Sequence, residues 1–335
     1  MQNSYHQIDR IHWIDIARGI CIIALVLYHT ESYYIDTYHV FQFNWCNNFL
    51  KTFFFLSGYL LYKEGKVYDN DFIKYKTKRI VKTLLIPYFI FTIALVIPKY
   101  YALHFHIQEA LTNIVLGKAS WFVSTLILSE LLFISILRWS KNSFLTLPIT
   151  SIIGLVAALI LSKCVTYNPW CFQQSLAVFS LLYLGFIYHQ YEKRLQNLNW
   201  TYILISAGVT MIILKIIVEK QKLVLNVYPL EINNLFFYII DAIVGILLII
   251  ATSKIIANNK LLEYTGKLSI IIYFLNGGVS VITSNMMNQV GFVYNELYYR
   301  VIIMFCMNLL IVLFISHIIY QYLPFIIGLK KQASQ

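Results

Sequence analysis

The stretch IHWIDIARGICIIALVLYHT, residues 11–30, decides the fold class of this chain. A membrane-spanning α-helix needs about 20 consecutive, mostly apolar residues, and this stretch has that length. The start MQNSYHQIDR does not resemble a cleaved signal peptide, because the apolar run after it has no small-residue cleavage pattern and is long enough to span. We therefore expect residues 11–30 to form a permanent transmembrane helix.

The composition extends this expectation to the whole chain of 335 residues, of which 59% are hydrophobic and 12% are charged. The mean hydropathy is +0.68. Soluble domains are about 45–50% apolar and about 25% charged, so too few charges are present to cover a soluble enzyme. The same values exclude intrinsic disorder. A polytopic membrane protein remains.

Nine further apolar stretches are long enough, or nearly so, to be spans. We predict an all-α polytopic membrane protein with about ten transmembrane helices, in a single transmembrane domain over residues 1–335. The predicted spans are 11–30, 47–62, 83–103, 120–138, 144–162, 172–189, 200–218, 232–252, 267–287 and 300–323.

The loop charges predict the orientation. With a cytoplasmic N-terminus, 17 Lys and Arg residues fall in inner loops and tails and 6 in outer loops, and the loop 31–46 has none. Cytoplasmic loops carry the excess of Lys and Arg, so both termini are expected in the cytoplasm. This asymmetry accounts for most of the net charge of +11. Nucleic-acid binding is therefore not needed to explain the charge.

The first predicted helix carries Asp15, Arg18 and His29. Eleven residues of helix turn through about 1100°, so Arg18 and His29 share a face and lie about 16 Å apart along the axis. Asp15 precedes Arg18 by three residues and can pair with it. Charges inside a span are functional candidates by default. The alternative is that Arg18 snorkels to the headgroups, neutralised by Asp15, and that His29 is an interfacial histidine.

A second basic feature is KYKTKRIVKTLLIPYFIF, residues 74–91, in which Arg79 and Lys82 are spaced i, i+3 and Lys78 is adjacent. Residues 63–82 hold seven basic side chains. Such a group suits a phosphate-bearing cytoplasmic ligand. Alternatively, it only follows the positive-inside rule or contacts anionic lipid.

Other polar residues fall inside predicted spans. Lys51 and Lys215 have side chains long enough that they could snorkel. Glu130 and Asp241 need a partner, a proton or a water cavity, whether they line a substrate path or tie helices together. His317 is expected to make an interhelical hydrogen bond.

The cysteines give no metal motif, since no CxxC or Cys/His spacing suggests zinc. Cys21 and Cys306 fall in apolar spans, where buried thiols are common. Cys46 lies in one predicted outer loop. Cys164 and Cys171 share another, where an oxidising compartment would allow a disulfide between them.

Five stretches give the chain a resemblance to acyltransferase family 3, the bacterial membrane O-acyltransferases, and within it to the fucose 4-O-acetylase-like group. They are WIDIARGICIIALVLYHT (13–30), FFFLSGYLLYK (53–63), KRIVKTLLIPY (78–88), WFVSTLIL (121–128) and, more weakly, YTGKLSIIIYFLN (264–276). The first has the family's Arg-x10-His spacing and the third its paired basic position. Their order and spacing agree over nearly the whole chain.

The chain departs from the family pattern at three places. Lys82 stands where many members have Arg, which keeps the charge without the planar fork. Asn276 stands where many members have His. The Trp-Ser-Leu-x-x-Glu pattern of longer relatives is absent, so Glu130 inherits no role from it.

The resemblance implies transfer of an acetyl group from cytoplasmic acetyl-CoA to a hydroxyl of an extracytoplasmic or lipid-linked glycan. Arg79, Lys82 and Lys78 would bind the phosphates of coenzyme A. His29 would be the general base, since its reference pKa of about 6.5 suits that role near neutral pH.

For the other residues, the resemblance implies that Arg18 steers the donor or stabilises developing charge and that Asp15 holds Arg18. It implies no metal cofactor, no nucleic-acid partner, and a place in the bacterial cytoplasmic membrane among lipids. The alternative is an exporter or a non-catalytic component of an exopolysaccharide synthesis system.

Overall fold

The computed structural model describes residues 11–35, 49–65, 67–97, 100, 106–140 and 145–329. Cys46 lies outside these residues. So do six of the basic residues that were counted for the orientation, namely Arg10, Lys66, Lys99, Lys141, Lys330 and Lys331.

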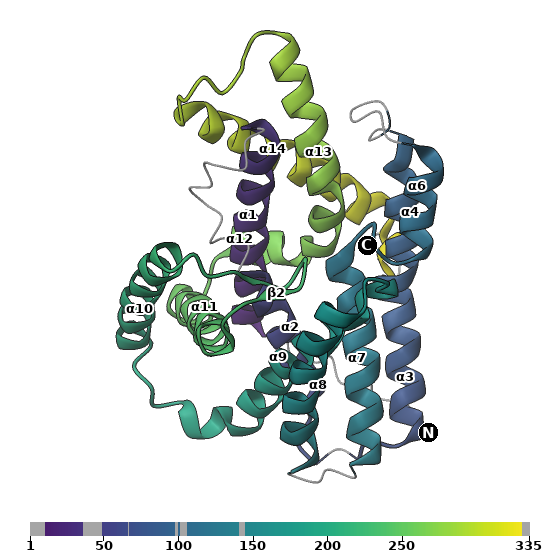
Figure 1. The fold of residues 1–335 in the computed structure, drawn as a ribbon, viewed down its shortest axis with the longest axis vertical. Helices are drawn as coiled ribbons and strands as arrows, with labels where there is room; N and C mark the ends of the chain where they lie inside the picture. The colour runs from purple at the N-terminus through teal and green to yellow at the C-terminus, as the bar shows by residue number, and fades with distance from the viewer. Residues whose placement is uncertain are drawn as a thin grey trace, which may run out of the picture.

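The described chain is helical except for one short hairpin (Figure 1). Eight helical segments in it are long and apolar enough to cross a membrane, and each coincides with a predicted span. The fold is therefore that of an all-α polytopic membrane protein. The eight are α1 (His12–Tyr34), α7 (Trp121–Trp139), α8 (Thr146–Cys164), α9 (Phe172–Tyr191) with its flanking turns, α10 (Trp200–Lys220), α11 (Leu235–Ile256), α13 (Ser269–Gln289) and α14 (Tyr299–Tyr322).

The other two predicted spans differ from expectation, so the count of ten is not confirmed. The span 47–62 corresponds to α2 (Leu50–Leu61), which has only 12 residues. The described part of the span 83–103 belongs to a rod beside α7, in which α3 (Asn70–Ile80), the π-helical segment η2 (Val81–Leu85) and α4 (Ile86–Ala94) follow one another (Figure 1). Residues 98, 99 and 101–103 of that span lie outside the described residues. The rod begins in polar sequence, where the Asp69 carboxylate accepts a hydrogen bond from the Phe72 amide at the helix N-terminus.

Several short elements lie between and after the long helices in the chain. The strands β1 and β2 form an antiparallel hairpin that contains a cis Tyr228–Pro229 bond. The short elements are α6 (Ile107–Val115), η3 (Pro169–Cys171), η4 (Glu192–Leu195), β1 (Leu225–Asn226), β2 (Glu231–Ile232), α12 (Lys260–Lys267) and η5 (Pro324–Ile327).

Helix α1 lies inside the bundle and packs against α2, α11, α12, α13 and α14. Glycines permit the closest helix contacts. A Cβ atom at Gly58 of α2 would overlap the Leu182 carbonyl of α9, and one at Gly266 of α12 would overlap the Asp15 carbonyl of α1. The close helix contacts therefore require a glycine at these positions of the Ser-Gly-Tyr and Tyr-Thr-Gly stretches.

Helices α8, α10 and α14 lie at the periphery and remain apolar on their outward faces. Ile152, Ile212 and Leu310 are each more than 60% exposed. Monomeric soluble proteins rarely expose such continuous apolar surface, whereas lipid accepts it. The outward faces of these three helices therefore suit contact with the hydrocarbon of a bilayer.

The disulfide that the sequence allowed between Cys164 and Cys171 is not formed, and both thiols are free. Cys164 is exposed at the end of α8, whereas Cys171 is buried and directs its sulfur toward the Gly117 carbonyl, 3.9 Å away. Because Cys171 is folded under the loop from α6 to α7, the two cysteines do not share one surface loop as expected.

Candidate functional site

His29 lies in a cavity of about 490 Å³. Three residues of α1 besides His29 line this cavity, namely Leu25, Tyr28 and Tyr33. Its other walls come from α2, α4, α6, α7, the hairpin loop and α13: Leu50, Thr92, Leu95, Val96, Glu109, Ala110, Asn113, Ile114, Ala119, Ser120, Trp121, Tyr228, Tyr273, Phe274 and Gly277.

Most of these walls belong to segments that the charge pattern predicts near the outer face, namely the end of α1, the starts of α2 and α7, and the hairpin loop. Tyr273 and Phe274 lie in the first turns of α13, which the same pattern predicts to start on the inner side. We therefore name this space the outer cavity. That name follows the predicted orientation, which stays a prediction.

The His29 ring is held between two tyrosines. Its centroid lies 5.4 Å from the Tyr28 ring and 5.8 Å from the Tyr33 ring, and the His29 and Tyr33 planes are 11° apart, so these two rings stack. Packing of this kind restricts the imidazole to a narrow range of orientations. The imidazole also lines the cavity, where it can reach a bound molecule.

Buried polar contacts fix α1 on both sides of His29. The Asn276 amide donates to the Leu25 carbonyl at 3.3 Å, one turn before His29. The Asn308 amide donates to the Thr30 hydroxyl at 3.0 Å, and the Thr283 hydroxyl donates to the Asn308 carbonyl oxygen at 2.5 Å. Asn276 thus contacts the backbone of α1 and holds α1 in position relative to α13.

Arg18 lies at the other end of α1 and does not line the outer cavity. Its guanidinium is 3.8 Å from the Asp15 carboxylate, so the predicted pair forms. Asp15 is buried, with 4% of its surface exposed, because α12 packs against it at Gly266. The position of Arg18 is therefore set by the contact between α1 and α12.

Glu130 of α7 lies within electrostatic reach of Arg18 and of the basic helix α3. The Ser57 hydroxyl of α2 donates a hydrogen bond to the Glu130 carboxylate of α7. Arg18, Lys76 and Arg79 all lie close enough to act electrostatically on that carboxylate. We call Ser57, Glu130, Arg18, Lys76 and Arg79 the inner cluster, following the same predicted orientation.

The charges of Arg18 and Arg79 thus act on one carboxylate, that of Glu130, which sequence spacing did not predict. Lys78 and Lys82, the other predicted donor-binding residues, are exposed on the rod, and Lys82 falls in its π-helical segment. Sequence reasoning missed Lys76, which is 8% exposed, and left Glu130 without an assigned role. Two features of the sequence could have pointed to Glu130: it is a charged residue inside a predicted span, and its partner Ser57 belongs to the Ser-Gly-Tyr stretch.

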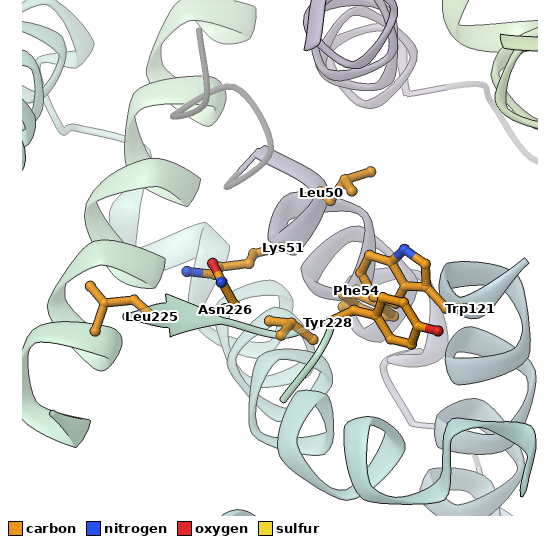
Figure 2. A pocket seen from close by; sticks show the side chains of 8 residues that line it. Leu50, Lys51, Phe54, Trp121, Leu225, Asn226 and Tyr228 are labelled. Carbon is orange, nitrogen blue, oxygen red and sulfur yellow. The ribbon is translucent and has the colours of Figure 1, made fainter. Parts of the chain in front are cut away.

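A smaller pocket of about 20 Å³ adjoins the outer cavity, and the two share Leu50, Trp121 and Tyr228 (Figure 2). The Trp121 and Tyr228 rings stack with centroids 5.1 Å apart and planes 4° apart. Burial raises the pKa of the Tyr228 hydroxyl, which lies outside the spans. Lys51 and Asn226 give this pocket its polar side. A space of this size holds about one water molecule.

Within the described residues, no group of three or more His, Cys, Asp or Glu side chains could hold a metal ion. His317 forms the interhelical hydrogen bond that the sequence predicts, because its Nδ1 lies 2.5 Å from the Tyr264 hydroxyl of α12.

The fold and the two sites define an all-α membrane protein with a histidine-containing cavity near one end of α1 and a cationic cluster near the other. The family model described as an acyltransferase domain matches residues 11–320. The chain therefore belongs to acyltransferase family 3, and the family assignment makes it a membrane acyltransferase. Comparison with curated proteins gave no match, and comparison with solved structures gave none.

Proposed function

We propose that this protein is an O-acetyltransferase of the fucose 4-O-acetylase-like group in the bacterial cytoplasmic membrane. It moves an acetyl group from cytoplasmic acetyl-CoA to a hydroxyl of an extracytoplasmic or lipid-linked glycan. The observation that carries the proposal is the arrangement along α1, with His29 in the outer cavity and Arg18, near the other end, acting on the same Glu130 carboxylate as Arg79. One helix thereby connects a candidate acceptor site to a candidate donor site.

His29 supplies the general base of the proposed reaction. It takes the proton of the acceptor hydroxyl as the hydroxyl oxygen forms a bond to the thioester carbonyl carbon. The carbon–sulfur bond then breaks, and the coenzyme A thiolate leaves and receives that proton from His29. Atoms and charge balance without a further reactant.

Cations near the inner end hold the donor in this proposal. The exposed side chains of Lys78, Arg79 and Lys82 bind its phosphates, because charge-assisted hydrogen bonds to phosphate are strong. Of the two roles predicted for Arg18, the geometry favours steering of the donor, because Arg18 lies in the inner cluster, away from the outer cavity. Asp15 keeps Arg18 in place.

The outer cavity suits a sugar acceptor. Its volume of about 490 Å³ falls within the range of about 300–1,000 Å³ that is usual for ligand pockets. The rings of Trp121, Tyr228 and Tyr273 supply flat apolar surface for a sugar face, and Glu109 and Asn113 supply hydrogen-bond acceptors for its hydroxyls.

The test is mass spectrometry of surface glycans from cells that carry the gene, lack it, or express His29→Ala. We expect the acetyl substituent only with the native protein, and a His12→Gln control to behave as native, because the His12 side chain is 60% exposed. Unchanged acetylation in a folded His29→Ala variant would overturn the assignment. Loss of the glycan itself from the surface would favour the exporter alternative.

A further inference from the structure

Two hydroxyl groups that the proposed reaction does not use meet in the wall of the outer cavity. Ser120 and Tyr273 both line this cavity, and the Ser120 hydroxyl donates a hydrogen bond to the Tyr273 hydroxyl oxygen at 3.3 Å. Ser120 directly precedes α7, and Tyr273 lies in the first turns of α13. The contact therefore joins two helices at the edge of the space that contains His29.

One proton of this hydroxyl pair has no acceptor in the described part of the protein. Two hydroxyl groups carry two protons, and the hydrogen bond between them uses one. Whichever hydroxyl donates, the other keeps its proton for a further acceptor. Among the described residues, neither hydroxyl donates to any group besides its partner. The pair therefore offers one hydrogen-bond donor to a molecule in the outer cavity.

The protein holds the hydroxyl pair in a fixed position. Ser120 is the N-cap residue of α7, yet its side chain makes no capping hydrogen bond, although serine is a preferred capping residue. Ser120 is buried, and the Tyr273 ring packs against the rings of Phe122 at 5.0 Å and Phe274 at 5.6 Å. The donor is thus oriented before a ligand binds, which is what stabilisation of a developing charge requires.

Helix α1 and the segment from α12 to α13 run parallel and in register. Leu25 of α1 contacts Asn276 of α13, which is 251 positions later in the chain. Asp15 of α1 and Gly266 of α12, which pack against each other, have the same separation. A residue of α13 therefore lies level with the residue of α1 that precedes it by 251 positions.

This register places Tyr273 level with Ile22, between Arg18 and His29. Arg18 precedes Ile22 by four residues and His29 follows it by seven, which correspond to about 6 Å and about 10 Å along the helix. An acetyl group that arrives from the Arg18 side therefore reaches the level of Tyr273 before that of His29.

We propose that Ser120 and Tyr273 form the oxyanion site of the acyl transfer. As the acceptor oxygen bonds to the thioester carbonyl carbon, the carbonyl oxygen becomes negatively charged, and the remaining proton of the hydroxyl pair hydrogen-bonds to it. The carbonyl double bond re-forms when the carbon–sulfur bond breaks, so the pair keeps both protons. The inference rests on the proposed function and deepens it, because it assigns the group that stabilises the transition state.

The key substitution is Tyr273→Phe, which removes the hydroxyl and keeps the ring that packs against Phe122 and Phe274. Loss of one oxyanion donor typically lowers kcat by about 100-fold or more. We therefore expect roughly 100-fold slower transfer and unchanged binding of acetyl-CoA. Ser120→Ala leaves the Tyr273 hydroxyl without its partner, and we expect roughly tenfold slower transfer because one orienting hydrogen bond is lost.

The experiment uses membranes from cells that express each full-length variant, because these membranes also contain the native acceptor. Isotope-labelled acetyl-CoA is added, and mass spectrometry follows labelled acetyl groups on the glycan at matched protein levels. Calorimetry on the protein purified in detergent gives the dissociation constant of acetyl-CoA. Infrared spectroscopy of the bound, labelled acetyl-CoA reports on the thioester carbonyl, because a hydrogen bond lowers its stretching frequency. Tyr273→Phe should raise that frequency.

Two control variants remove the same groups elsewhere in the protein. Tyr264→Phe removes a hydroxyl that pairs with His317 away from the outer cavity. Ser140→Ala removes the hydroxyl of a serine at the other end of α7 that is 8% exposed, as Ser120 is. Both controls should transfer acetyl groups at the native rate. A residue with a structural role alone would change the folded fraction but not the carbonyl frequency.

The outcomes separate this proposal from the proposed function. Slow transfer by Tyr273→Phe with native binding of acetyl-CoA and a raised carbonyl frequency supports the oxyanion site. Native transfer by Tyr273→Phe, or a loss that follows weaker binding of acetyl-CoA, overturns the oxyanion site and leaves the proposed function intact. If the native protein neither binds nor uses acetyl-CoA, the proposed donor is wrong and so is the oxyanion site.

A second variant decides the question should Tyr273→Phe fail to fold. Ser120→Ala must then slow transfer roughly tenfold relative to Ser140→Ala and bind acetyl-CoA as the native protein does. Equal rates in these two serine variants would overturn the oxyanion site.

Discussion

The Lys51 ammonium lies 2.7 Å from a carboxylate oxygen of Asp241, and both residues are buried. The other Asp241 oxygen is 3.6 Å from the Lys215 ammonium, and Lys51 also lies 4.7 Å from the centre of the Tyr238 ring. Lys51 therefore does not snorkel. An ion pair satisfies its charge in place, because α2 is covered by α11 at that level.

Breaking this pair should be costly. Lys51→Met removes the shorter of the two lysine contacts of Asp241, and Asp241→Asn removes the negative charge that both lysines share. Removing one partner of a buried ion pair typically costs about 3–5 kcal/mol. We expect each variant to lose that much free energy of unfolding, as measured in detergent by denaturant titration.

The matched control is the exposed pair of Glu64 and Lys193, at 2.6 Å. Lys193 lowers the pKa of the Glu64 carboxyl, yet water screens the pair. Glu64→Gln should leave the unfolding curve unchanged near neutral pH. If Lys51→Met behaves like Glu64→Gln, the ion pair contributes nothing to stability.

Gly58→Ala should disrupt the contact between α2 and α9. The added methyl group would overlap the Leu182 backbone carbonyl, which cannot rotate away as a side chain would. Overpacking in a core typically costs about 1–3 kcal/mol and sometimes more. Gly208→Ala is the control, because its methyl would only touch a Leu248 side chain at 4.0 Å. Similar thermal unfolding of the two variants would contradict the close packing.

Trp121→Ala should reduce glycan acetylation because it weakens binding of the acceptor glycan in the outer cavity. It removes the ring that stacks on Tyr228 and lines the outer cavity. Aromatic stacking of this kind is worth about 1 kcal/mol. We therefore expect acetylation to fall roughly fivefold when the acceptor concentration limits the reaction. Trp139→Ala deletes the same side chain at a position that is 85% exposed, and it should acetylate normally. Mass spectrometry at matched protein levels measures both, and equal acetylation would exclude Trp121 from acceptor binding.

Thiol labelling can test the predicted orientation. Cys164 is exposed at the end of α8 that the charge pattern predicts on the outside, whereas Cys171 is buried. Cys306 is also exposed, so the background is Cys46→Ser/Cys306→Ser. In it, a membrane-impermeant maleimide applied to intact cells should label the protein. Cys164→Ser should abolish that labelling, and Cys171→Ser should not. Labelling only after cell lysis would show that Cys164 faces the cytoplasm, which is the opposite of the predicted orientation.

The sequence predicted the membrane class and eight of the helices from apolar runs alone. This works because a bilayer requires about 20 apolar residues in each helix, whatever the helix packs against. The common face of Arg18 and His29 follows from helix periodicity in the same way. The pair of Asp15 and Arg18 needs only a spacing of three residues.

Tertiary structure alone decided the partners of the buried charges. Ser57 and Glu130 are 73 positions apart, and Lys51 and Asp241 are 190 apart. Helix periodicity says which face a residue occupies but not which helix covers that face. The same limit applies to the outer cavity, whose walls come from segments between Leu25 and Gly277. The sequence by itself determined where the chain is helical and apolar, and packing decided which polar groups meet, because those contacts depend on how distant helices fit together.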